Sequence, residues 1–339
     1  MTFFDKKIWY TLFKGSVIMA KKKYKLKIDG FIYLAVIIVI IILCFKGIDA
    51  YKTYKYHKTT EYKLIKAGYS IEDVKVLSKN LKEKELLDLT TKKKNTKLLE
   101  LMKNKKYLHK NYKEYLTYMD LNPNKKIDDV INIVNLHLNY NFYEDTKETN
   151  TKKENLMLVN KYNYLSENYV PDDLVTISTK YSWGTSGSQK IKKEVFDEFL
   201  RMHEDANLNG IYLMVSSSYR DYDSQKKVYD NYEKNHGEAY ADKIAARPGY
   251  SEHQTGLSLD IFSLEEPAQA TFKDSKAYAW LKDNAHNYGF IVRYPDGKEN
   301  ITGFKFEPWH YRYVGKEAAK YIYKNQITFE EYYVYNIKK

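Results

Sequence analysis

An uninterrupted apolar run, FIYLAVIIVIIILCF at residues 31–45, most constrains how this chain can fold. A typical spanning helix needs ~20 residues, and the positions up to Ile48 lengthen the run slightly. The segment KKKYKLK at residues 21–27 places a basic flank before the run, which favours a cytoplasmic N-terminus and an external remainder. We therefore expect residues 1–30 to be a basic cytoplasmic N-terminus and residues 31–48 to be a transmembrane signal anchor.

A cleaved signal peptide is the competing interpretation of the same run. No convincing small-x-small cleavage site follows it, which favours an uncleaved, single-pass anchor. Met19, directly before AKKK, is an alternative start of the chain. Cys44 is the only cysteine, so the chain can form neither an internal disulfide nor a cysteine-based metal site. Ile42 and Leu43 precede Cys44, whereas lipid attachment requires small residues there.

The chain is basic, with 56 Lys and Arg against 44 Asp and Glu and a formal net charge of +12. This excess fits either a solvated lysine-rich surface or attraction to an anionic partner, such as a membrane surface, an acidic wall polymer or nucleic acid. No zinc-finger, RNA-binding or basic-zipper pattern is present, so we expect no nucleic-acid partner. Nothing in the sequence indicates the oligomeric state.

Composition and periodicity divide the rest of the chain. Residues 51–144 are rich in lysine, poor in proline and helical in period, which predicts a helical stalk or accessory region. Within it, Ser70 opens a Ser-x-x-Asp helix start, and residues 122–139 read as a turn followed by a helix. Residues 145–155, DTKETNTKKEN, are polar and predict a linker. We expect one domain over residues 156–339.

In the last domain, segments with helical periodicity alternate with segments with strand periodicity. Amphipathic and alternating patterns predict helices at 190–208, 222–246 and 275–287, and strands at 211–220, 257–262, 288–295 and 306–314. Helices mixed with short strands that are joined by long excursions predict an α+β fold with a small, mostly antiparallel sheet and flanking helices. No internal repeat is present.

One predicted strand carries an aspartate among apolar residues. In SEHQTGLSLDIF, residues 251–262, the pattern alternates after Gly256, with Leu259 and Ile261 on one face and Asp260 on the other. A buried carboxylate is costly unless it is paired or bound to a metal. The pattern therefore predicts a partner for Asp260.

Candidate partners lie in the final strand and in the loop before Asp260. Glu307 and His310 would face opposite sides of a regular strand, but Pro308 between them favours an irregular start or bulge that turns both into one cleft. Two imidazoles, from His253 and His310, and the Asp260 carboxylate make a common catalytic zinc set, with Glu307 left as a base. Taken singly, each residue also fits an ordinary loop, turn-capping or core position, and spacing alone leaves both interpretations open.

Three ordered motifs extend this pattern. GYSEHQTGLSLDI, EPWHYRYVG and SSYRDYDSQ together resemble the zinc D-alanyl-D-alanine carboxypeptidase family, in its VanY-type and LdcB-like L,D-carboxypeptidase branch. The resemblance covers roughly residues 156–335. It implies that one zinc ion is bound by His253, Asp260 and His310, and that Glu307 is the catalytic base.

The resemblance also implies residues that meet the substrate. Arg220 occupies the position of an arginine that binds the scissile carbonyl and its oxyanion. Gln225 and Ser251 match positions that line the substrate site, and Trp309 either flanks the substrate or packs in the core. Tyr250 departs from the histidine expected in the family pattern, at a position that is not a ligand.

These expectations combine into a functional hypothesis. The chain would be a membrane-anchored, extracytoplasmic zinc carboxypeptidase that removes the C-terminal D-alanine from peptidoglycan stem peptides, by L,D or D,D cleavage, in a Gram-positive-type wall. A zinc muropeptide endopeptidase, which would use the same metal site, is a further alternative. A non-catalytic peptidoglycan-binding protein is the alternative from another class, and the retention of Glu307 beside a complete ligand set argues against it.

Overall fold

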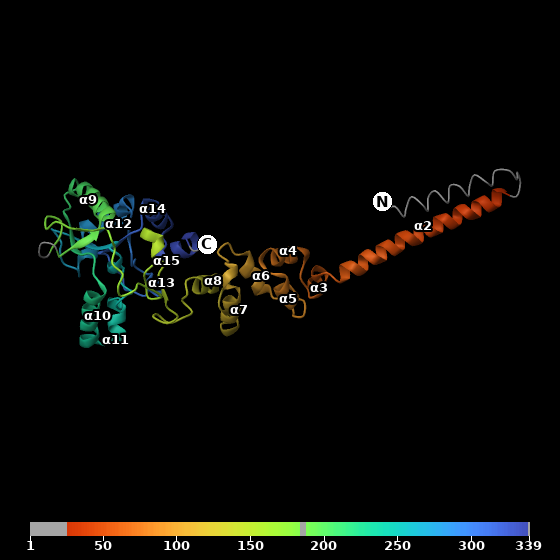
Figure 1. The fold of residues 1–339 in the computed structure, drawn as a ribbon, viewed down its shortest axis with the longest axis horizontal. Helices are drawn as coiled ribbons and strands as arrows, with labels where there is room; N and C mark the ends of the chain where they lie inside the picture. The colour runs from red at the N-terminus through yellow and green to blue at the C-terminus, as the bar shows by residue number, and fades with distance from the viewer. Residues whose placement is uncertain (1–25, 184–187, 338–339) are drawn as a thin grey trace. The chain divides into compact units, whose positions relative to one another are not determined.

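A computed structural model of the chain describes residues 26–183 and 188–337 (Figure 1). The alternative start at Met19 and most of the basic N-terminal segment lie outside the described residues. The chain divides into two compact units, Met1–Lys105 and Lys106–Lys339. Each unit is considered by itself below.

The first unit contains the apolar run within one long helix, α2 (Leu26–His57). At 1.5 Å per residue, its 32 residues span about 48 Å. Large apolar side chains from Phe31 to Phe45 are exposed along it. The stretch Gly30–His57 is long and apolar enough to cross a membrane, although a signal sequence near an N-terminus meets the same criterion.

Four short helices follow α2 in the first unit. They are α3 (Thr60–Lys66), α4 (Ile71–Asn80), α5 (Glu83–Leu89) and α6 (Thr96–Lys103). The predicted start of α4 is confirmed, because Ser70 and Asp73 form a reciprocal capping box. Leu64, Leu77 and Leu101 are fully buried and give these helices a small core.

The second unit begins earlier than the domain boundary expected from the sequence. Helices α7 (Tyr112–Leu121) and α8 (Ile127–Asn135) fall within it, and the Asn135 side chain donates to the Tyr335 hydroxyl at 3.2 Å. The predicted linker at 145–155 also has regular structure. Strand β1 (Lys147–Glu148) pairs in parallel with β2 (Asn163–Tyr164), and a 3-10 segment, η2, spans Thr151–Leu156. The polar composition of this segment gave no indication of these backbone pairings.

A four-stranded antiparallel sheet lies at the centre of the second unit. Its strands, in spatial order, are β5 (Leu213–Ser217), β6 (Ser258–Ser263), β8 (His310–Tyr313) and β7 (Phe290–Val292). A separate antiparallel pair joins β3 (Leu174–Thr176) to β4 (Lys190–Lys192). The predicted α+β fold with a small antiparallel sheet is confirmed.

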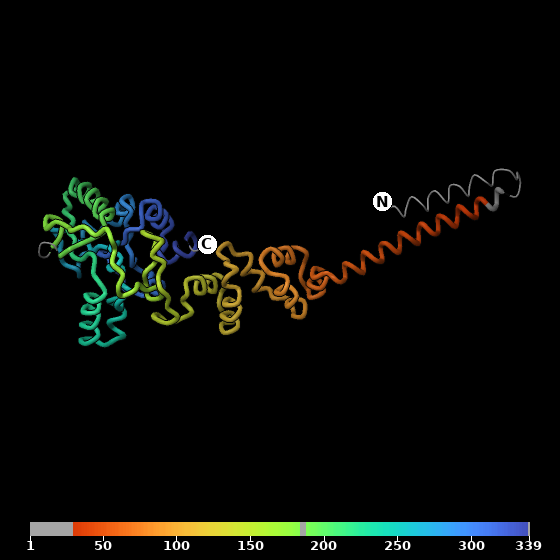
Figure 2. Tube along the Cα trace, viewed as in Figure 1, coloured from red at the N-terminus to blue at the C-terminus, as the bar shows by residue number. Residues whose placement is uncertain are grey.

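Helices lie around this sheet and beyond it. They are α9 (Lys193–Asn207), α10 (Tyr222–His236), α11 (Glu238–Ile244), α12 (Lys276–Asn284), α13 (Glu299–Thr302), α14 (Lys316–Asn325) and α15 (Phe329–Tyr332). Figure 1 shows α10 and α11 extending away from the rest of the unit. The single helix predicted over 222–246 is wrong, because Gly237 adopts φ 83° and ends α10. Figure 2 shows that α10 and α11, which the break separates, run side by side.

The two faces of the sheet have different characters. Leu259, Ile261 and Tyr311 are fully buried in the main core, where α9 and α12 contact the sheet. Burying each such side chain stabilises the fold by about 1.5–3 kcal/mol. Because side chains alternate along a strand, Asp260 and His310 lie on the opposite face. The apolar face thus holds the strands in place while the polar face is free to form a site.

Candidate metal centre and its cavity

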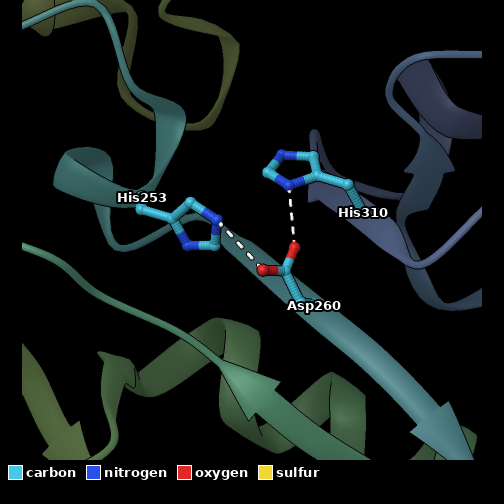
Figure 3. A group of neighbouring side chains, drawn as sticks. All are labelled: His253, Asp260 and His310. Carbon is cyan, nitrogen blue, oxygen red and sulfur yellow. Dashed lines mark hydrogen bonds and ion pairs between the residues drawn. The ribbon is translucent and has the colours of Figure 1, made fainter. Parts of the chain in front are cut away.

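Strand register brings Asp260 and His310 together. The two residues are direct partners across the antiparallel pair β6 and β8, so their side chains leave the sheet on the same face. The His310 Nδ1 atom lies 2.9 Å from the Asp260 Oδ1 atom (Figure 3). The partner that the sequence required for Asp260 is therefore a histidine fifty positions later in the chain.

His253 reaches the same carboxylate from a 3-10 turn, η3 (Glu252–Thr255). The Ser251 side chain caps this turn, and Gly256 ends it at φ 64°, where a Cβ atom would lie 3.0 Å from the Leu174 side chain. His253 Nδ1 lies 2.7 Å from the Ser218 carbonyl oxygen. A carbonyl can only accept, so Nδ1 carries the proton and Nε2 presents its lone pair towards Asp260 Oδ2, 3.5 Å away (Figure 3).

The three side chains fit a zinc ion. One ligand atom from each of His253, Asp260 and His310 lies within 4.8 Å of the other two. Two imidazole nitrogens and a carboxylate oxygen form the three-ligand set of catalytic zinc sites, in which a fourth position stays open. No cysteine is needed, in agreement with the position of Cys44 in the apolar helix.

The protonation of the metal-free centre follows from its burial. Burial lowers the pKa of His253, which favours the neutral ligand form. Burial acts in the same direction on His310, but its hydrogen bond to the Asp260 carboxylate and the nearby Glu252 carboxylate outweigh it and raise the His310 pKa to about 9. The neighbouring histidines hold the pKa of Asp260 well below its usual range, although burial opposes this. At neutral pH, zinc binding to His310 would therefore displace a proton.

Zinc binding is expected to release at least one proton per ion at pH 7. Because His310 is protonated below a pKa of about 9 and must be neutral to bind metal, the apparent Kd should rise at least about tenfold for each pH unit lost between pH 8 and 6.5. Calorimetry in buffers of different ionisation enthalpy counts the protons. A Kd that is flat over this range, with no proton released, would show that His310 is already neutral.

Glu307 lies beside this centre as the sequence indicated. The predicted strand 306–314 is too long, since β8 begins only at His310, and the backbone turns so that the His310 N–H donates to the Glu307 carbonyl at 3.3 Å. The turn brings Glu307 Oε2 to 3.9 Å from His310 Nδ1. Burial raises the Glu307 pKa to about 8 in the absence of metal. A nearby dication would lower that pKa and favour the carboxylate form.

Arg220 lines the same cavity and follows the end of β5. Its Nη1 donates to Gln225 Oε1 at 2.9 Å, and its Nη2 donates to Ser217 Oγ at 3.0 Å. The Gln225 amide nitrogen in turn donates to the Ala246 carbonyl at 2.7 Å. Both the oxygen and the nitrogen of the buried Gln225 amide are therefore hydrogen-bonded within the protein, the oxygen to Arg220 and the nitrogen to Ala246.

All eight residues singled out in the sequence line one cavity of about 550 Å³. Ser251 is buried there and accepts from the His253 N–H at 3.3 Å. Trp309 lines the cavity and also stacks on Phe262, at 6.2 Å between ring centroids, so it packs against the core and faces the site. The structure brings these residues together, and their individual roles remain predictions.

Sequence reasoning missed a cluster of buried charges behind the centre. Glu252, Arg293, Arg312 and Glu330 are all buried, and both arginines donate to Glu252 Oε1, at 2.8 and 2.7 Å. Breaking a buried ion pair by removing one partner typically costs 3–5 kcal/mol, because the other charge is left uncompensated. The sequence did contain a hint of this cluster, because Glu252 directly precedes His253 and the two predicted strands 288–295 and 306–314 each contain an arginine.

Two histidines and an aspartate that fit a zinc ion, a neighbouring glutamate and a buried arginine line one cavity, which is the arrangement expected of a zinc peptidase of the hydrolase class. The family model described as VanY, D-alanyl-D-alanine carboxypeptidase, matches residues 188–316. The Bacillus subtilis putative carboxypeptidase YodJ is 45% identical over 197 residues, which are 56% of this chain and 71% of that protein. The chain belongs to the VanY family of D-alanyl-D-alanine carboxypeptidases, and its cofactor is zinc.

The chain is also similar to solved structures. The LdcB LD-carboxypeptidase, whose structure addresses peptidoglycan recognition, is 41% identical with a TM-score of 0.53, and the match covers 56% of this chain and 90% of that one. A variant of the VanY D,D-pentapeptidase from a VanB-type vancomycin resistance cassette, solved with Zn(II), is 36% identical with a TM-score of 0.45. That match covers 52% of this chain and 98% of the other.

Proposed function

We propose that this chain is a membrane-anchored zinc carboxypeptidase that removes the C-terminal D-alanine from peptidoglycan stem peptides. The observation that carries the proposal is the convergence of a complete zinc ligand set, a carboxylate base and a buried arginine on one cavity. A non-catalytic peptidoglycan-binding protein would need the cavity but would have no need of a base beside the metal.

Each side chain has a distinct task in the proposed reaction. Zinc bound by His253, Asp260 and His310 would supply Lewis acidity towards a peptide carbonyl and towards water. Glu307 takes the proton of the attacking water and returns it to the leaving amine. Arg220 donates to the oxygen that becomes negative as the carbonyl is attacked, and its bonds to Gln225 and Ser217 hold it ready.

The anchor part of the proposal rests on α2. Its apolar side chains from Phe31 to Phe45 are exposed, and hydrocarbon would remove them from water. An anchor there would leave the catalytic unit on the outer side of the membrane, where stem peptides lie. Residues 51–144 would then provide helical accessory structure, of which the part from Lys106 onward belongs to the second unit.

We further propose L,D or dual cleavage rather than strict D,D cleavage. Support comes from the 41% identity to the LdcB LD-carboxypeptidase. The two reactions share the metal, the base and the arginine, and they differ in the peptide that enters the cavity. L,D cleavage converts a tetrapeptide stem to a tripeptide, whereas D,D cleavage converts a pentapeptide to a tetrapeptide.

The proposal is tested by incubating the 339-residue chain, purified in detergent, with tetrapeptide, pentapeptide and cross-linked muropeptides. We expect zinc-dependent release of D-alanine, detected by mass spectrometry, which stops with a chelator and returns with added zinc. Release from the tetrapeptide establishes L,D activity, and release from the pentapeptide establishes D,D activity.

Two results would contradict the proposal. Cleavage inside the cross-linked peptides without release of free D-alanine would make the chain an endopeptidase. Inertness of the zinc-loaded chain towards all three substrates would exclude peptidoglycan carboxypeptidase activity altogether.

A further inference from the structure

The Glu252 carboxylate lies directly behind the metal ligand His310. Its Oε2 atom is 3.6 Å from His310 Nε2, slightly beyond hydrogen-bond length. Both atoms are buried, and neither has a hydrogen-bond partner among the described residues. Two buried polar atoms that face each other in this way need only a small approach to satisfy one another.

The orientation of the His310 ring indicates a role for Glu252 in placing the ring proton. Nδ1 faces Asp260 and the metal centre, so it must present a lone pair, and the proton of the neutral ring must then sit on Nε2. A carboxylate at Nε2 accepts that proton and favours this tautomer. The backbone carbonyl of Ser218 does the same for His253 with the two nitrogens exchanged. Both imidazoles thus have a fixed acceptor on the side away from the metal.

Glu252 is itself held in one orientation. Arg293 Nε and Arg312 Nη1 both donate to Oε1, which leaves Oε2 aimed at His310. Arg293 is fixed in turn by two bonds to the Glu330 carboxylate of α15, at 2.6 and 3.0 Å. Arg312 is fixed by the carbonyl oxygens of Asn155 and Met157, at 3.0 and 2.8 Å.

We propose that Glu252, clamped by Arg293 and Arg312, is a positioning residue that sets the His310 tautomer and thereby the affinity for zinc. In this proposal Glu252 acts through His310 and not directly on the reacting atoms. The inference rests on the zinc site of the proposed function but not on its substrate.

The substitution Glu252→Gln is a sharp test because the two arginines determine how the new amide lies. They are donors, so they hold the amide oxygen at the Oε1 position and leave the NH₂ group facing His310 Nε2. A donor there favours a lone pair on Nε2 and moves the ring proton to Nδ1, where it blocks the metal. We expect zinc affinity, measured by competition with a chromophoric chelator, to fall about 10- to 100-fold.

A matched control is Glu331→Gln, next to Glu330 in α15. Glu331 pairs with Lys298 at 3.7 Å and caps the helix, and glutamine serves equally well at that capping position. Its zinc affinity should equal that of the unchanged chain. If Glu252→Gln lowers only the thermal stability of the metal-free chain, with zinc affinity unchanged, Glu252 is merely structural and the proposal fails.

A second measurement needs no substitution and therefore does not depend on the folding of a variant. In the zinc-loaded chain, ¹⁵N NMR of the histidine side chains should show the His310 proton on Nε2 and the His253 proton on Nδ1. A His310 proton on Nδ1 would overturn the proposal. A chain with these tautomers that cleaves no muropeptide would contradict the proposed function and leave this inference intact.

Discussion

Replacing Glu307 with glutamine should lower kcat for D-alanine release by about 10²–10⁴-fold, the range that a general base contributes. The substitution keeps the size of the side chain and removes its capacity to accept a proton from water. Glu307 is not among the three grouped ligand residues, and its Oε2 atom lies 3.9 Å from His310 Nδ1. Zinc should therefore remain bound, and KM should change little.

Metal content and activity must be measured on the same preparation. The control is Glu331→Gln, which makes the same chemical change away from the cavity and should retain full activity. If Glu307→Gln loses zinc along with activity, Glu307 is a ligand rather than a base. If it retains both, the proton acceptor lies elsewhere.

The sequence predicted those site residues whose side chains do not suit the secondary-structure pattern around them. Asp260 stood out because a carboxylate interrupts an apolar strand, and that anomaly required a partner. The identity of the partner followed from the EPWH segment and the family resemblance rather than from periodicity. The antiparallel register of β6 and β8 then explains why residues fifty positions apart face one another.

The missed features depend on tertiary contacts that leave no local pattern. In the sequence, Arg312 looks like an ordinary outward-facing polar residue of a strand. It is nevertheless fully buried, where Glu252 and three backbone carbonyl groups accept its hydrogen bonds. The segment 145–155 reads as a linker, but β1 within it pairs with β2. Helix ends and strand lengths also shifted, as at Gly237, because turn geometry and packing determine them.

Replacing Arg220 with alanine should also lower kcat by about 10²–10³-fold, the loss seen when one donor to a developing oxyanion is removed. Burial lowers the Arg220 pKa, while the nearby charges of Asp260 and Glu307 oppose that shift. Lysine keeps the charge but lacks the planar fork that meets Gln225 and Ser217, so Arg220→Lys should recover only part of the rate.

The distribution of the loss between kcat and KM identifies what Arg220 recognises. An interaction made only as the oxyanion forms lowers kcat and leaves KM nearly unchanged, whereas one made equally in the bound substrate raises KM alone. Removing a positive charge near the centre should not weaken zinc binding, because the guanidinium repels the dication. A raised KM with an unchanged kcat would instead assign Arg220 to the carboxylate at the end of the peptide.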